Sequence, residues 1–264
     1  MKMESVKELW RYRELLYFFA WRDIKVRYRQ AAFGAAWAVI QPLLTMIIFS
    51  LLFGRVAHID TGNVPYPIFV FCGLLPWTYV SGVLGFASLS LVSNEPLLTK
   101  VYFPRVFLPF GSVLAGLLDF LIGSILLVGL MFYYHVRAGW FLLLIPFVVL
   151  AMVLLTAGVS MVAAALSVRY RDVRYALPFL IQVWMFATPI VYPVAVIPER
   201  FRPILALNPC WGIVVGLRAC LFRGLPFDFR LMGVSLAIAM MVFFLGALLS
   251  QGGEELRRRD LDGE

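Results

Sequence analysis

Charged side chains are scarce along most of this chain: Asp, Glu, Lys and Arg make up 14% of its 264 residues, against about 25% in average soluble domains. Five long runs contain no ionised side chain, and a sixth contains only Asp119. Each run exceeds the roughly 20 apolar residues that an α-helix needs to cross a bilayer. We therefore predict an all-α membrane protein with six transmembrane helices, in the runs between residues 29 and 55, 60 and 95, 105 and 137, 137 and 169, 174 and 199, and 230 and 254.

Groups that carry out catalysis are also scarce. The two histidines, His58 and His135, lie in separate short loops and form no metal set. No pair of carboxylates lies together at membrane depth to act as acid and base. None of the four lysines follows a glycine, so a Walker A loop for ATP is absent. The three cysteines lack metal or redox spacing. We predict that this chain is no enzyme and binds no metal or cofactor.

The distribution of basic residues predicts the orientation in the membrane. Positively charged loops are retained in the cytoplasm, and 16 of the 23 Lys and Arg residues fall on the inner side if the N-terminus is cytoplasmic. An even number of spans then keeps both termini cytoplasmic. The run from Pro203 to Leu217 is too short for a seventh span, so we predict a re-entrant outer hairpin at about residues 195–226. The net charge of +8 fits anionic headgroups or a cytosolic partner and requires no nucleic acid.

The N-terminal 30 residues are predicted to form a cytoplasmic interface segment, followed by a six-span transmembrane domain over residues 31–264. Apolar residues between Ser5 and Ala20 gather near one helical face, which is typical of a helix lying in the membrane interface. The WRDIKVRYRQ stretch after it mixes charges with aromatic rings. We interpret that stretch as an anchor at the level of the lipid headgroups.

Two predicted spans carry polar and aromatic stripes. Gly34, Trp37, Gln41 and Thr45 recur at intervals of three and four residues in the first span. The fifth span repeats this pattern with a set of prolines, a glutamine and an aromatic ring: Pro178, Gln182, Phe186, Pro189 and Pro193. Polar groups are costly against lipid, so both stripes should face protein or water. A conduit and a buried helix contact both remain open on this evidence.

Asp119 lies near the centre of the third predicted span, with Ser112, Gly116 and Gly123 on its face. An acid at this depth is a candidate for ion or proton transfer. The small neighbours favour a different role, a carboxyl that pins one helix to another, because they allow close helix approach. No Lys, Arg or His lies in any other predicted span to complete a relay.

Two segments outside the spans have distinctive patterns. The inner loop from Asn94 to Arg105 carries five large apolar residues, more than a solvated loop would expose, so we predict a short helix docked on the membrane or on another protein. In the outer hairpin, Asn208 followed by Pro209 is a helix-start signal.

Several segments together resemble the permease subunit of bacterial ABC exporters of surface polysaccharides, such as O-antigen, capsule and teichoic acid. They are WRDIKVRYRQAAFGAAWAVIQPLL, FCGLLPWTYV, NEPLLTKVYFPR, LSVRYRDVRYALPFLIQVWMFATPIVYP and LNPCWGIVVGLRACLFRG. The resemblance implies a homodimer in the bacterial inner membrane with two copies of a separate ABC ATPase, which binds the ATP and Mg. Its expected cargo is an undecaprenyl-linked polysaccharide, with O-antigen favoured.

The resemblance also implies three groups of site residues. Those expected to line a substrate conduit, where aromatic rings suit sugar faces and neutral polar groups suit hydroxyls, are Trp37, Gln41, Thr45, Gln182, Phe186 and Tyr192. Those expected to form an outer gate are Asn208, Trp211 and Arg218. Those expected to couple to the ATPase are Glu95, Leu98, Lys100, Tyr102 and Arg105.

Four alternatives remain open. A permease for capsule or teichoic acid and one for drugs or lipids belong to the same class. A membrane enzyme that builds the glycan would need an acidic metal-binding loop, whereas the inner loops carry only Glu95 and Asp172, each alone. A membrane scaffold would leave the docking loop and the polar stripes unexplained.

Overall fold

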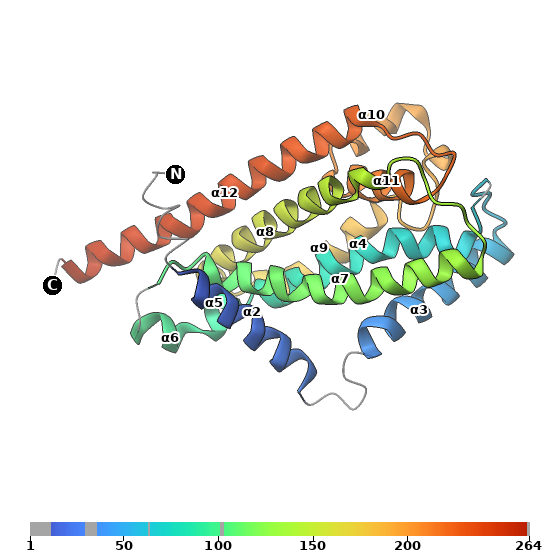
Figure 1. Cartoon of the computed structure of the whole chain (residues 1–264). Helices are drawn as coiled ribbons and strands as arrows, with labels where there is room; N and C mark the ends of the chain where they lie inside the picture. The colour runs from blue at the N-terminus through green and yellow to red at the C-terminus, as the bar shows by residue number, and fades with distance from the viewer. Residues whose placement is uncertain (1–11, 30–35, 63, 101–102, 263–264) are drawn as a thin grey trace.

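The computed structural model describes residues 12–29, 36–62, 64–100 and 103–262 (Figure 1). Every regular element within these ranges is a helix, and β-type pairing among them is limited to one isolated bridge between Ala138 and Phe222. The helices lie roughly along one common direction and form an elongated bundle. The predicted all-α fold is confirmed.

Five helices of the described ranges are long and apolar enough to cross a membrane. Each corresponds to one of the uncharged runs. They are α3 with its π-helical continuation η2 (Trp37–Val56), α4 (Tyr66–Ala87), α7 (Phe107–Tyr133), α8 with the short η3 before it (Leu142–Arg169), and the apolar part of α12 (Phe229–Ser250). Helix α12 as a whole is Phe229–Asp262.

The fifth uncharged run forms a shorter helix than its length suggested. Helix α9 is Val173–Phe186, with 14 residues, and at 1.5 Å per residue it extends about 21 Å. The chain after it is mostly irregular as far as the short 3-10 helix η4 (Val194–Val196). Pro189 and Pro193 lie in this segment, where each removes a backbone N–H donor and disfavours helical conformation in the residue before it.

A bent pair of helices lies where the outer hairpin was predicted. The 3-10 helix η5 (Glu199–Phe201) leads into α10 (Arg202–Leu205), α11 is Pro209–Leu221, and the two parts meet at an angle of 105°. Counting this bent pair as one span would raise the total from five to six. Helix α11 is almost wholly buried, because it packs against α4, α8 and α12. It therefore forms part of the core.

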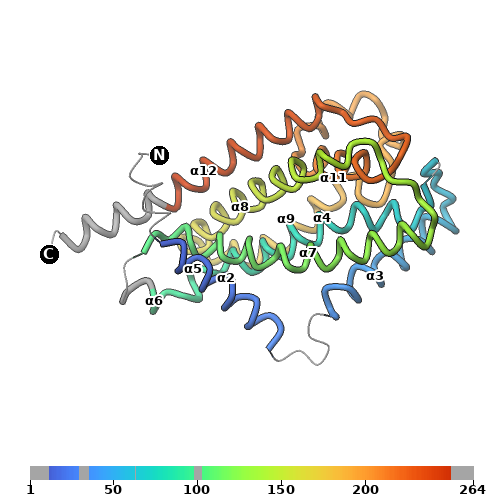
Figure 2. Tube along the Cα trace, in the orientation of Figure 1, coloured from blue at the N-terminus to red at the C-terminus, as the bar shows by residue number. Residues whose placement is uncertain are grey.

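Helix α4 is the centre of the bundle. Its most apolar window is 78% buried, against 11% for α3. Helix α12 packs along α8 (Figure 2). Glycines permit this contact: a Cβ added at Gly158 of α8 would lie 2.5 Å from the backbone nitrogen of Phe243, and one at Gly246 would lie 2.6 Å from the carbonyl oxygen of Gly158.

A second, smaller core lies around α2 (Arg13–Tyr28), at the end of the bundle that the basic residues predict to be cytoplasmic, here called the inner end. It joins α2 to α5 (Ser90–Ser93), to the segment after α6 (Glu95–Lys100) and to the start of α7. Its buried members are Phe19, Leu91, Phe103, Phe107, Leu108 and Ala164. The predicted interface helix over residues 5–20 falls partly outside the described residues. Helix α2 itself continues to Tyr28, through most of the stretch interpreted as a headgroup anchor.

Candidate functional site

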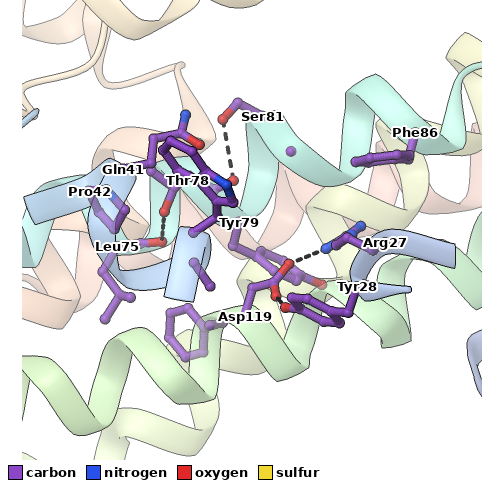
Figure 3. Close-up of a pocket in the computed structure, with 14 residues that line it drawn as sticks. Arg27, Tyr28, Gln41, Pro42, Leu75, Thr78, Tyr79, Ser81, Phe86 and Asp119 are labelled. Carbon is purple, nitrogen blue, oxygen red and sulfur yellow. Dashed lines mark hydrogen bonds and ion pairs between the residues drawn. The ribbon is translucent and has the colours of Figure 1, made fainter. Parts of the chain in front are cut away.

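Asp119 lies in the middle of α7 and is held by two residues of α2. Arg27 forms an ion pair with one carboxylate oxygen, and the Tyr28 hydroxyl donates to the other (Figure 3). The Arg27 guanidinium also lies 4.6 Å from the centre of the Phe86 ring, at the end of α4. These contacts agree with the interpretation of Asp119 as a carboxyl that pins one helix to another. Its partner comes from α2, which the sequence placed at the membrane surface.

Further polar contacts hold the same helix. Ser112 of α7 donates to the carboxylate of Asp23 at 2.7 Å. Arg22 donates to the side-chain oxygen of Asn94, also at 2.7 Å. Close approach is possible because Gly111 has no side chain: a Cβ there would lie 3.0 Å from Cβ of Phe19. Helix α2 is thus fixed to α7 along half of its length.

A cavity of about 300 Å³ lies beside this ion pair, between α2, α3, α4 and α7. Figure 3 shows its lining, with Gln41, Thr78 and Ser81 on the wall opposite Asp119. The Thr78 and Ser81 hydroxyls donate to carbonyls of their own helix at 3.0 and 2.8 Å, so their oxygens can still accept. Trp37 also lines the cavity and is 49% exposed. Such a lining offers an aromatic face together with several hydrogen-bonding groups.

The predicted conduit residues fall into separate places. Trp37 and Gln41 share the cavity, whereas Thr45, one turn on, donates to the backbone carbonyl of Gln41 at 2.8 Å. Gln182 and Phe186 are exposed on α9 and do not line the cavity. The structure of a single chain therefore does not bring the two predicted stripes together.

Tyr192 lies in the irregular segment after α9. Its hydroxyl donates to the carbonyl of Phe186 at 2.8 Å, and its ring lines a second, mostly apolar cavity beside η5 and α10. Tyr192 therefore ties the end of α9 to the outer hairpin.

The side chain of Asn208, one of the predicted gate residues, makes four hydrogen bonds. Its side-chain oxygen accepts from the backbone N–H of Cys210 at 3.1 Å, which confirms the predicted helix start, and from the Trp184 indole at 2.8 Å. Its amide donates to Ala187 and Thr188, at the end of α9. Asn208 thus joins α11 to the end of α9.

Arg218, a second predicted gate residue, is buried in α11 and is 3% exposed. Its guanidinium donates to the carbonyls of Phe69, Pro189 and Ile190, with distances of 3.1 Å to Phe69 and 2.7 Å to Pro189. It also lies 3.6 Å from the centre of the Phe69 ring. Trp211, the third, is buried as well, and both line an outer cavity of about 600 Å³.

Comparison with known proteins decides the family. Residues 14–222 match the family described as ABC-2 type transporter. The chain belongs to this family.

Individual relatives of this ABC-2 transporter chain match most of its length. It is 32% identical over 253 residues to the O-antigen export system permease protein RfbA of Myxococcus xanthus, covering 95% of this chain and 96% of that protein. It is 29% identical over 213 residues to the protein of the same name from Klebsiella pneumoniae, covering 80% and 81%. It is 23% identical over 244 residues to the polysialic acid transport protein KpsM of Escherichia coli, covering 89% and 91%.

The predicted coupling residues of this ABC-2 transporter chain lie at its inner end. Glu95, Leu98 and Lys100 belong to α6, Arg105 lies just before α7, and Tyr102 lies outside the described residues. At least one apolar residue of this loop is already buried within the chain. Phe103 is 3% exposed and packs against α2, with its ring centre 5.3 Å from the ring centre of Phe19.

Sequence reasoning missed the residues that hold α2 in this ABC-2 transporter chain, above all Arg27 and Tyr28. Both were assigned to the headgroup anchor. A signal was nevertheless present, because a buried carboxylate needs a cation or donors, and the charged stretch before the first span supplied both. Among the described residues no three His, Cys, Asp or Glu side chains come together to hold a metal ion.

Proposed function

We propose that this chain is the membrane subunit of an ATP-driven exporter, which moves a lipid-linked polysaccharide across the bacterial inner membrane to its outer side. O-antigen is the cargo favoured by the full-length similarity to the O-antigen export permease of Myxococcus xanthus, which spans 95% of this chain. That similarity is the observation that carries the proposal. Membership in the ABC-2 family supports the class of transporter.

The partners follow from the class. We infer a homodimer with two copies of a separate ABC ATPase, which binds ATP and Mg, and an undecaprenyl-linked substrate. Both termini lie in the cytoplasm, as the distribution of basic residues indicates. The inner loop with α6 and Lys100 would contact the ATPase.

The exposed face of α9 supports a conduit that is completed by a second copy. None of its 14 residues is buried within one chain, although the helix is apolar. Gln182 and Phe186 both lie exposed on it. An amide is costly against lipid, so we infer that this face meets the second copy or a water-filled passage. Trp37 and Gln41 would add a sugar-binding surface on α3.

Export of a capsular polymer is the second candidate. The specific observation in its favour is the match to the polysialic acid transport protein, at 23% identity over 89% of this chain. The lower identity ranks it below O-antigen. The two candidates differ in which surface polymer disappears when the chain is removed.

The test is deletion of the gene in its own host, followed by complementation. Loss of O-antigen from the cell surface, with polymer accumulating inside, is the expected result. Complementation should require an intact Walker lysine in the partner ATPase. Loss of capsule with normal O-antigen would transfer the assignment to the second candidate, and normal display of both polymers would refute the proposal.

A separate arm tests the ATPase contact. Replacing Lys100 by Glu should lower co-purification of the two subunits while the chain still inserts in the membrane. Equal recovery of the complex, with equal export, would remove α6 from the proposed contact.

A further inference from the structure

The ion pair at Asp119 connects two parts of the chain that the proposed function assigns to different tasks. Helix α2 and the segment after α6 share one apolar cluster at the inner end, through Phe19 and Phe103. At its other end, α2 reaches the middle of α7 and the wall of the cavity that Trp37 lines. A continuous set of contacts therefore runs from the inner loop to mid-membrane.

Helix α2 runs in the same direction as the first half of α7. Phe19 faces Gly111, Asp23 accepts from Ser112, and Arg27 reaches Asp119. Along this contact the residue numbers of α2 and of α7 increase in the same direction, so the two helices are parallel here.

The polar groups at this contact satisfy one another. Each oxygen of Asp119 has a donor, and the side chains of Arg27 and Asp119 are 17% and 26% exposed. Asp23 is bonded both by Ser112 and by Arg22. Separating the helices would leave a carboxylate and a guanidinium without partners in a place of low dielectric, which is strongly unfavourable. The two helices should therefore move together.

We propose that Asp119 is a positioning residue for coupling: by clasping the end of α2 to the middle of α7, it makes α2 and the inner half of α7 one rigid lever that transmits ATPase motion to the cavity. This inference rests on the proposed function, since it assumes an ATPase partner at the inner end. The pair acts through geometry and contacts no substrate in this role. Its loss separates ATP hydrolysis from export.

The first test measures polysaccharide exported per ATP hydrolysed by the reconstituted complex. Asp119→Asn and Arg27→Met should each leave complex yield and ATP turnover near wild type, while export per ATP falls roughly tenfold, within the range of coupling carried by packed networks. The control is Arg29→Met, because Arg29 is an exposed cation at the end of the same helix. It should leave the ratio unchanged. A residue with only a structural role would lower yield and turnover together and leave the ratio intact, which would overturn the proposal.

A second variant tests whether geometry alone suffices. The side-chain oxygens of Asp23 and Ser112 lie 2.7 Å apart, so Asp23→Cys with Ser112→Cys places two thiols within reach of a short bis-thiosulfonate cross-linker, which would join α2 to α7 and is cleaved by reductant. Combined with Asp119→Asn, this pair should restore export per ATP when cross-linked and lose it again with reductant. The described native cysteines are buried and should not interfere. Failure of the cross-linked pair to restore coupling, with the cross-link shown to be formed, would overturn the lever.

A third arm is independent of any polysaccharide. Asp119→Asn should raise hydrogen exchange of the backbone amides in residues 22–28 roughly tenfold, with α8 and α12 unchanged, because local opening of α2 becomes easier. If the wild-type complex exports no polysaccharide, the proposed function fails. This measurement still reports on the clasp, that is, the contact of Asp119 with Arg27 and Tyr28. Unchanged exchange in residues 22–28 would refute the clasp itself, whatever the cargo.

Discussion

Arg218 offers the sharpest test of how the outer hairpin is held, through the substitution Arg218→Met. Methionine keeps the apolar stem and removes the charge and all the donors. In the native protein the guanidinium binds the carbonyls of Phe69, Pro189 and Ile190, and no carboxylate is among the partners that the structure shows for it. The hydrogen bonds by which this side chain joins α11 to α4 and to the segment after α9 therefore all go to backbone carbonyls.

The size of the effect follows from which carbonyls lose their only donor. Phe69 lies inside α4, where its carbonyl also accepts an intrahelical bond. Pro189 and Ile190 lie in an irregular segment, so their carbonyls would be left without that donor. Each buried orphan costs about 1–3 kcal/mol, or about 2–6 kcal/mol for both. Removing a buried charge returns several kcal/mol of desolvation free energy. Toward the upper end of that range the cost of the orphaned carbonyls exceeds the returned desolvation free energy, so we expect a net loss of about 2 kcal/mol, which raises the open fraction of the hairpin roughly 30-fold.

The assay uses two native thiols. Cys210 and Cys220 lie on α11 and are buried, at 3% and 0% exposure. Their labelling by a maleimide in detergent reports opening of the hairpin, and Arg218→Met should accelerate it roughly 30-fold. Arg200→Met is the control, because Arg200 is exposed. Labelling that stays at the wild-type rate, or rises equally in the control, would refute the reasoning.

Gly73 provides an independent route to the same effect. A Cβ there would lie 2.5 Å from Nη2 of Arg218 and 2.8 Å from the carbonyl oxygen of Ile190. Gly73→Ala should therefore displace the guanidinium and also expose the two thiols, although Arg218 itself is unchanged. Fast labelling in the arginine variant alone would show that the loss of charge, and not the loss of the carbonyl contacts, opens the hairpin.

The features predicted well from sequence depend on local chemistry. Uncharged runs predict spans because burying a charge in hydrocarbon is costly wherever it lies in the chain. The start of α11 was predictable because the cap involves only Asn208, Pro209 and the backbone N–H of Cys210. The bend before α11 followed from a run too short to span. None of these needs knowledge of a distant residue.

The features that were missed depend on partners far apart in sequence. Arg27 and Asp119 are separated by 92 positions, and no periodicity connects them. Arg218 was predicted only as a gate residue, whereas its carbonyl partners lie in α4 and after α9. The length of α9 was misjudged for another reason: the prolines of this run predict a bent or broken helix, yet the whole run through Pro189 and Pro193 was counted as one span.

Three further changes test the helix contacts and the cavity. Gly158→Val should destabilise the fold by about 1–3 kcal/mol, seen as a lower melting temperature in detergent, because its Cβ would meet backbone that cannot move aside. Asn208→Ala should cost about 1–2 kcal/mol by the same assay, through loss of a helix cap and of the bonds to the end of α9. The last change is Gln41→Cys, compared with Ile48→Cys on the same helix. Gln41 lines the cavity, whereas Ile48 is 55% exposed on an apolar helix and is expected to face lipid. The thiolate is the form of cysteine that attacks thiol reagents, and it forms in water and not in hydrocarbon. A charged reagent should therefore label position 41 and spare position 48, and equal labelling of the two would show that water does not reach this cavity selectively.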